Sequence, residues 1–177
     1  MTVVSGNIIY LFKRYITEKF GDAEFEKILN KLSDKNKAVL GESIISSKIY
    51  DVSVLDEMLS AFEDEYGHEE IMVGSKWFAE QQLKGLYGIV IKFATPEKVF
   101  RQKPKITKKI FPEGEFELKE FDEHYIKLRY ANVQLSDIIM EMILLIDKAI
   151  AEIVLKTDVK VERESADDST FDVIMRF

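Results

Sequence analysis

Cysteine is absent from the 177-residue chain, and the residues of common catalytic motifs are scarce. Without a thiol, the chain has no cysteine nucleophile, no disulfide and no thiolate metal site. The only two histidines, His68 and His124, adjoin turn residues, and no H-E-x-x-H spacing is present. A phosphate loop, a dinucleotide fingerprint and a serine elbow are missing as well. The sequence therefore predicts no enzyme, no metal site and no cofactor.

The start of the chain lacks the features of a signal peptide. Its first residues, "MTVVSGNIIYLFKRY", have no basic beginning, no long apolar run and no small-residue cleavage site. Together with the missing cysteines, this predicts a cytoplasmic protein. Hydrophobic residues make up 46% of the chain, enough for one sizeable core, so we expect a single domain over residues 1–177.

Charge is unevenly distributed along the chain. The net charge of -7 argues against a general nucleic-acid binder. Segment 92–109 nevertheless gathers seven lysines and arginines, whereas segment 56–70 gathers seven aspartates and glutamates. Such runs are most often solvated faces, and the alternative is a surface for an anion or a partner on the basic side.

Apolar residues at helical spacing dominate the first half of the chain. They predict helices over 5–20, 22–32, 51–66 and 75–93, with a loop over 33–37. A further short helix begins at Thr95 and Pro96.

Two glycines, Gly85 and Gly88, interrupt the helix predicted over 75–93. Each costs about 1 kcal/mol relative to alanine inside a helix, so a close approach of the backbone is expected there. The approach is either tight helix packing or space for a ligand against that face.

The second half of the chain has the short β-rich segments that are typical of a small sheet. Segments 105–111, 115–121 and 124–130 are short, rich in β-forming residues and bounded by turn residues, which predicts an antiparallel meander. A long helix over 136–155 and a final hairpin follow. The predicted fold is α+β, with N-terminal helices packed on a small antiparallel sheet and one long helix before the last hairpin.

The long helix over 136–155 is apolar around most of its circumference. Glu141, Lys148 and Glu152 form one narrow polar stripe, and the charges in the segment exclude a membrane span. The apolar remainder is either wrapped by the helix's own domain or shared with a second subunit. A small domain with one sheet leaves much of that surface uncovered, so we expect a homodimer.

The strand in "DEHYIKLRYA" presents two different faces. Side chains alternate along a strand, so Ile126, Leu128 and Tyr130 point to the core while Tyr125, Lys127 and Arg129 point away from it. The second set is either a solvated sheet surface or a clamp for an anionic ligand.

In order and spacing, several of these segments resemble the haem nitric-oxide/oxygen-binding (H-NOX) domains. The segments are "GNIIYLFKRYITEKFGD", "YDVSVLDEMLSAFEDEYG", "IKFATPEKVFRQKP" and "YIKLRY". The wider superfamily includes vinyl-reductase-type ligand-binding domains and subunits of the Golgi transport particle. The resemblance covers most of the chain and implies an H-NOX-like fold.

The resemblance also bears on haem. In haem-binding members, a histidine ahead of the "ATP" turn ligates iron, and a Tyr-x-Ser-x-Arg strand motif binds the haem carboxylates. Here Lys84 stands at the counted position of the histidine, and segment 75–93 contains none. Tyr125 and Arg129 match the strand motif, while Lys127 replaces its serine.

These features predict a haem-free ligand-binding or signalling domain. Its ligand would have an anionic end at Tyr125, Lys127 and Arg129 and an apolar body against Lys84, Gly85 and Gly88, and a signalling protein would be its partner. The alternative is a scaffold or assembly subunit with a closed pocket. A gas sensor and a vinyl-reductase-like enzyme fit the residues less well.

Overall fold

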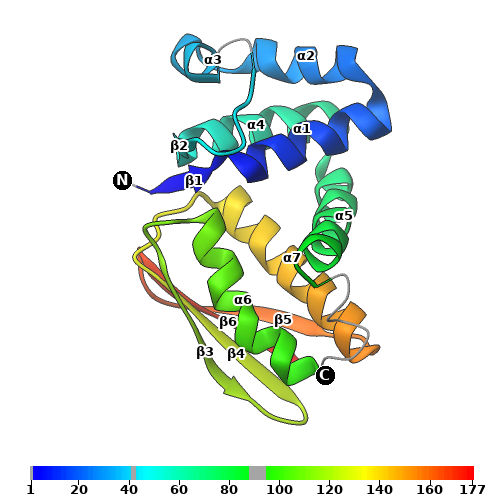
Figure 1. Cartoon of the computed structure of the whole chain (residues 1–177), viewed down its shortest axis with the longest axis vertical. Coiled ribbons are helices and arrows are strands. Elements are labelled where there is room, and N and C mark those ends of the chain that lie inside the picture. The colour runs from blue at the N-terminus through cyan, green and yellow to red at the C-terminus, as the bar shows by residue number, and fades with distance from the viewer. Residues whose placement is uncertain (1, 41–42, 88–94) are drawn as a thin grey trace.

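Helices fill the first part of the chain and an antiparallel sheet fills the last part (Figure 1). The structure, a computed structural model, describes residues 2–40, 43–87 and 95–177. Within these residues the elements are, in order, β1 (Val3–Ser5), α1 (Gly6–Phe20), α2 (Asp22–Lys31), α3 (Asp34–Leu40), β2 (Ile49–Asp51), α4 (Val52–Tyr66), α5 (His68–Tyr87), α6 (Pro96–Ile110), β3 (Glu115–Phe121), β4 (Tyr125–Ala131), α7 (Asp137–Leu155), β5 (Lys160–Asp167) and β6 (Thr170–Arg176).

The sheet confirms the predicted α+β class. Its strand order is β3-β4-β6-β5, all antiparallel, and α7 connects β4 to the final β5–β6 hairpin. The short strands β1 and β2 form a separate pair beside the N-terminal helices. These two strands are too short to leave an alternation pattern, so the sequence did not reveal them.

The sheet and the N-terminal helices lie at opposite ends of the molecule, with α7 between them (Figure 1). Helix α6 packs against β3, and α7 contacts both β5 and β6. Helix α5 lies along α7, and α1, α2 and α4 pack together above them. An aromatic cluster of Phe12, Tyr15, Phe62 and Phe78 joins α1, α4 and α5.

Two predicted segments are wrong. Residues 105–111, expected as a strand, continue helix α6 through Pro104 to Ile110. The buried residues Val99, Lys103, Ile106 and Thr107 recur every three or four positions, and this helical burial outweighs the β propensity of Ile and Thr. Residues 33–37, expected as a loop, lie largely in helix α3, which spans Asp34–Leu40.

Helix boundaries also differ from the predicted ones in one informative place. Helix α5 begins at His68, directly after Gly67, rather than at residue 75. Gly67 has a positive φ of 83°, which ends α4 and lets a new helix begin at once. The turn between α4 and α5 is therefore a single residue.

Helix α7 is covered mainly by the chain's own elements. Its buried residues include Ile139, Met142, Ile146 and Ile150. Leu144 and Leu145 are half-buried, and none of the apolar side chains of α7 is among the exposed large hydrophobic residues described.

No helix among the described residues has the length and apolarity needed to cross a membrane.

Candidate functional site

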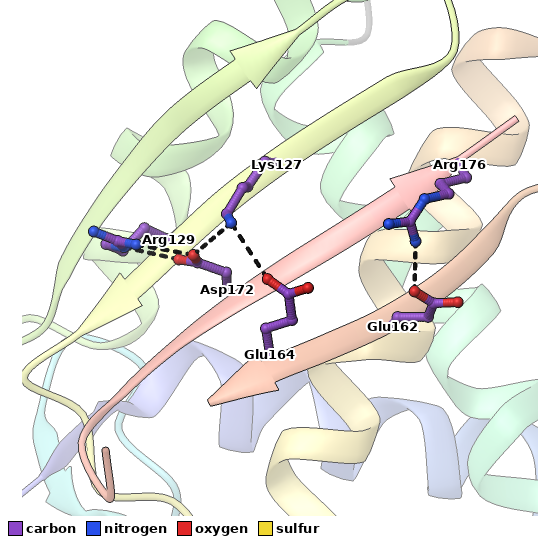
Figure 2. Close-up of polar contacts among 6 residues, drawn as sticks. All are labelled: Lys127, Arg129, Glu162, Glu164, Asp172 and Arg176. Carbon is purple, nitrogen blue, oxygen red and sulfur yellow. Dashed lines mark hydrogen bonds and ion pairs between the residues drawn. The ribbon is translucent and has the colours of Figure 1, made fainter. Parts of the chain in front are cut away.

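The outer face of the sheet carries a ladder of ion pairs (Figure 2). As the alternation predicts, Ile126, Leu128 and Tyr130 of β4 are buried, so Lys127 and Arg129 project from the opposite face. The guanidinium of Arg129 donates through Nε and Nη2 to the two oxygens of Asp172, at 2.8 and 2.9 Å. Strand β6 places Asp172 directly opposite Arg129 in the register.

The same carboxylate also holds Lys127. The ammonium lies 3.0 Å from an oxygen of Asp172 and 3.4 Å from Glu164 of β5. Hydrogen bonds from Arg129, and then from Lys127, hold the pKa of Asp172 below its usual value. Arg176 and Glu162 form a further pair beside them (Figure 2). An anionic ligand at Arg129 therefore has to compete with Asp172, which already occupies the guanidinium fork.

A cleft of about 670 Å³ lies between α1, α5 and α6. Its volume suits a small molecule. The described residues that line it are Ser5, Asn7, Ile8, Leu11 and Arg14 from α1 and its cap, Gln81, Gln82 and Lys84 from α5, and Ile106, Lys109 and Ile110 from α6.

The rim of the cleft is cationic, whereas its wall is largely apolar. Arg14 is paired with Glu18 at 2.6 Å and lies over the Trp77 ring. Lys84 is only loosely paired with Glu80, at 3.7 Å. Among the residues described, no carboxylate pairs with the exposed Lys109. Lys109 is therefore the cation with most freedom to meet an anion.

Behind the cleft lies a buried charged network. Lys103 of α6 and Asp147 of α7 are 5% and 0% exposed, and their charged atoms are 2.8 Å apart. The phenol of Tyr130 donates a hydrogen bond to the other oxygen of Asp147. Burial, and then the nearby carboxylate, raise the pKa of Tyr130 well above its usual value, so the phenol stays protonated. Thr107 donates to the backbone carbonyl of Lys103 at 3.1 Å.

Gln82 separates this network from the cleft. It lines both the cleft and a small chamber of about 20 Å³ that the network residues close from behind. Only 7% of Gln82 is exposed, and in the described part of the chain neither atom of its amide has a hydrogen-bonding partner. The amide of Gln82 is thus buried between the cleft and the chamber, and no described residue satisfies it.

The predicted site residues do not come together in one place. Lys84 lines the cleft, and Gly85 lies in the last turn of α5, while Gly88 lies outside the described residues. Lys127 and Arg129 are on the outer face of the sheet (Figure 2), and the alternation along β4 puts Tyr125 on the same face.

Of the described residues that line the cleft, only Lys84 was among the predicted site residues, and Arg14, Gln82 and Lys109 are the missed ones on which the site depends. Arg14 and Gln82 carried no signal, because an arginine or a glutamine on a helix is ordinary. Lys109 did carry one, since it belongs to the basic segment 92–109.

Comparison with solved structures shows the H-NOX fold. An H-NOX protein from K. algicida in the Fe(II) unliganded state superposes with a TM-score of 0.68 at 15% identity, covering 97% of this chain and 95% of that one. The H-NOX from Shewanella woodyi in the Fe(II)CO state gives 0.65 at 16% identity, with 97% and 93% covered. A structure from work on haem distortion in the H-NOX family gives 0.65 at 12% identity, with 98% and 94% covered. No family model and no curated protein matches the sequence.

The residues present do not fit a histidine-ligated haem. His68 starts α5, at the end of that helix opposite to Lys84, and its ring contacts Glu63 and Glu141. His124 lies in the turn between β3 and β4. Neither lines the cleft, and the described residues contain no cluster of three potential metal ligands. The fold is that of the H-NOX structures, and neither of the chain's two histidines lines the cleft.

Proposed function

We propose that this chain is a haem-free ligand-binding domain with the H-NOX fold, which acts by binding rather than by catalysis. The ligand is a small molecule with an apolar body and an anionic end, and it occupies the cleft between α1, α5 and α6. Ligand occupancy would be passed to a signalling partner, and the whole chain forms one such domain.

The composition of the cleft carries this proposal. Ile8, Leu11, Ile106 and Ile110 offer an apolar wall, and Arg14, Lys84 and Lys109 stand around it. Apolar walls with a few placed polar groups are the usual makeup of small-molecule sites, and cations at the rim favour an anionic end. The open cleft also favours a ligand-binding role over the alternative of a scaffold with a closed pocket.

The dye 8-anilinonaphthalene-1-sulfonate combines an apolar body with an anionic end and serves as a probe. Lys109→Ala is expected to raise its Kd roughly fivefold, because a charge-assisted contact contributes about 1.5 to 3 kcal/mol and exposure screens part of it. Fluorescence titration measures the change. Lys105→Ala, at an exposed position of the same helix outside the cleft lining, is the matched control and should leave Kd unchanged. Equal Kd values for the two variants would remove the cleft as the binding site.

Anion binding by Tyr125 and Arg129 stays a prediction, and the same titration tests it. If the strand holds the sulfonate, Arg129→Ala weakens binding roughly tenfold, because a charge-assisted bond to the guanidinium is lost. If the cleft holds it, Arg129→Ala leaves Kd unchanged, since Asp172 already occupies that guanidinium.

Self-association through α7 also stays a prediction. A second copy would cover the half-buried side of the helix, where Leu145 lies. Leu145→Glu is expected to convert a dimer to a monomer in sedimentation velocity, because a carboxylate cannot be buried unpaired in an interface. Lys156→Glu, exposed just beyond the helix, is the control. A wild-type protein that sediments as a monomer contradicts the dimer.

A further inference from the structure

The proposed function uses only one cation, Lys109, of the basic segment 92–109. Most of that segment folds as α6, which carries six lysines and arginines and one glutamate, Glu97, in a chain whose net charge is -7. Glu97 is already engaged, because Arg101 donates to it through Nε and Nη2. Helix α6 therefore concentrates positive charge that its own sequence does not neutralise.

Three cations of α6 have no counter-charge among the described residues. Lys98, Lys105 and Lys109 are exposed, and no carboxylate in the described part of the chain lies within ion-pair distance of them. Lys103 of the same helix differs, because it is buried and pairs with Asp147 at 2.8 Å. The three exposed ammonium groups are thus available to an anion from outside the chain.

The three lysines stand in one row along α6. They are spaced seven and four residues apart, so a helix with 3.6 residues per turn directs them within about 40° of one another. The row is roughly 16 Å long, because each residue adds about 1.5 Å along the axis. Lys109, at one end, also lines the cleft. We refer to Lys98, Lys105 and Lys109 as the lysine row.

We propose that the lysine row docks an acidic helical segment of the signalling partner, with carboxylates spaced to face the three ammonium groups. A membrane surface fits less well, because none of the exposed large hydrophobic residues described lies on α6 to insert among lipids. A long polyanion such as nucleic acid would bring the acidic remainder of the chain close to its phosphates. A short acidic segment contacts α6 alone, so its charge complements the row without that repulsion.

Lys109 links the lysine row to the cleft. An anionic ligand in the cleft binds the same ammonium, so its presence removes one of the three charges that attract the partner. Ligand binding therefore weakens docking, and docking weakens ligand binding by the same factor. This coupling rests on the proposed function, whereas docking on Lys98 and Lys105 does not depend on a ligand in the cleft.

A synthetic helix tests the docking. The probe is an alanine-rich peptide whose glutamates are spaced seven and four residues apart, and its counterpart has glutamines at those positions. In titrations followed by ¹H–¹⁵N NMR at low ionic strength, only the glutamate peptide is expected to shift amide signals of α6. Lys98→Glu with Lys105→Glu should raise its Kd roughly tenfold or more, because like charges then face each other.

A matched double variant controls for net charge. Lys76→Glu with Lys160→Glu changes the net charge equally at exposed positions of α5 and β5, and it should leave the Kd of the glutamate peptide within about twofold. Lys98→Gln with Lys105→Gln removes the charges of the row without reversing them, and should give a smaller loss in the same direction. Equal losses in the two charge-reversed variants would mean general attraction and would overturn the lysine row.

Other occupants are outcomes of the same experiment. A short DNA duplex and vesicles that contain phosphatidylserine are titrated under the same conditions. Either of them may not replace the peptide if the proposal is right: binding of the duplex or the vesicles through Lys98 and Lys105, without binding of the glutamate peptide, overturns the acidic protein partner.

Competition with the dye 8-anilinonaphthalene-1-sulfonate separates this inference from the proposed function. Saturating dye should raise the Kd of the glutamate peptide roughly threefold in the wild type and leave it unchanged in Lys109→Ala. Dye that binds in the cleft without changing the Kd of the peptide overturns the coupling through Lys109. A protein that binds the peptide on the lysine row but does not bind the dye overturns the proposed function and leaves the docking in place.

Discussion

Asp147→Leu is expected to lower the free energy of unfolding by about 3 to 5 kcal/mol, because it leaves the ammonium of Lys103 buried without its counter-charge. Lys103 is 5% exposed, and Asp147 is the carboxylate within 2.8 Å of it. Removing one member of a buried ion pair costs far more than the pair contributes, since the remaining charge has lost both water and its partner. Urea unfolding followed by circular dichroism measures the difference.

The double variant Lys103→Met with Asp147→Leu is the informative control. Replacing a buried pair by apolar residues of similar size is often neutral or stabilising, so the double variant should recover most of the loss. If Asp147→Leu alone costs less than about 1 kcal/mol, the pair is solvated in solution and the buried network is not a determinant of stability.

This network also fixes the geometry of the cleft. Lys103 lies about one turn before Ile106 and about two turns before Lys109 on α6, and Asp147 anchors Lys103 to α7. A helix tied at this point holds its cleft-facing residues in one place relative to α1 and α5. Asp147→Leu should therefore weaken binding in the cleft as well as stability, although no network residue has to touch the ligand.

Part of this architecture could be predicted from the sequence because it depends on local periodicity. The alternation along residues 125–130 gave both faces of β4, and helical spacing gave α1, α4 and α7. The strand predicted over 105–111 was wrong because Ile106 and Thr107 have β propensity, whereas the helical spacing of the buried residues Val99, Lys103 and Ile106 belongs to a helix.

The candidate site was harder to predict, since its residues meet only through the tertiary fold. Asp147 lies in an apolar helix and carries no local sign that its partner is Lys103, 44 positions earlier in the chain (147 − 103). Asp172 likewise gives no local sign that it pairs with Arg129, which lies opposite it on the neighbouring strand. Charged residues in a sequence show what is available for binding, but only the fold shows which of them are already paired.

The protein is expected to show no Soret band after expression with haem supplied, because neither histidine is in a position to ligate iron in the cleft. Hydrogen bonding to Glu63, and then the charge of Glu141, raise the pKa of His68, which favours the imidazolium form. An imidazolium has no free lone pair for a metal. His124 lies in the β3–β4 turn, outside the cleft lining.

Lysines near the cleft do not replace the missing histidine. Lys84 is exposed and pairs with Glu80, and Lys103 is engaged by Asp147. Absorbance of the purified protein, before and after incubation with haem, decides the matter. A Soret band that disappears in His68→Ala or in His124→Ala would show that a surface histidine ligates iron, and the haem-free proposal would fail. A weak band that survives both substitutions would instead report haem adsorbed without histidine ligation, since these are the only two histidines in the chain.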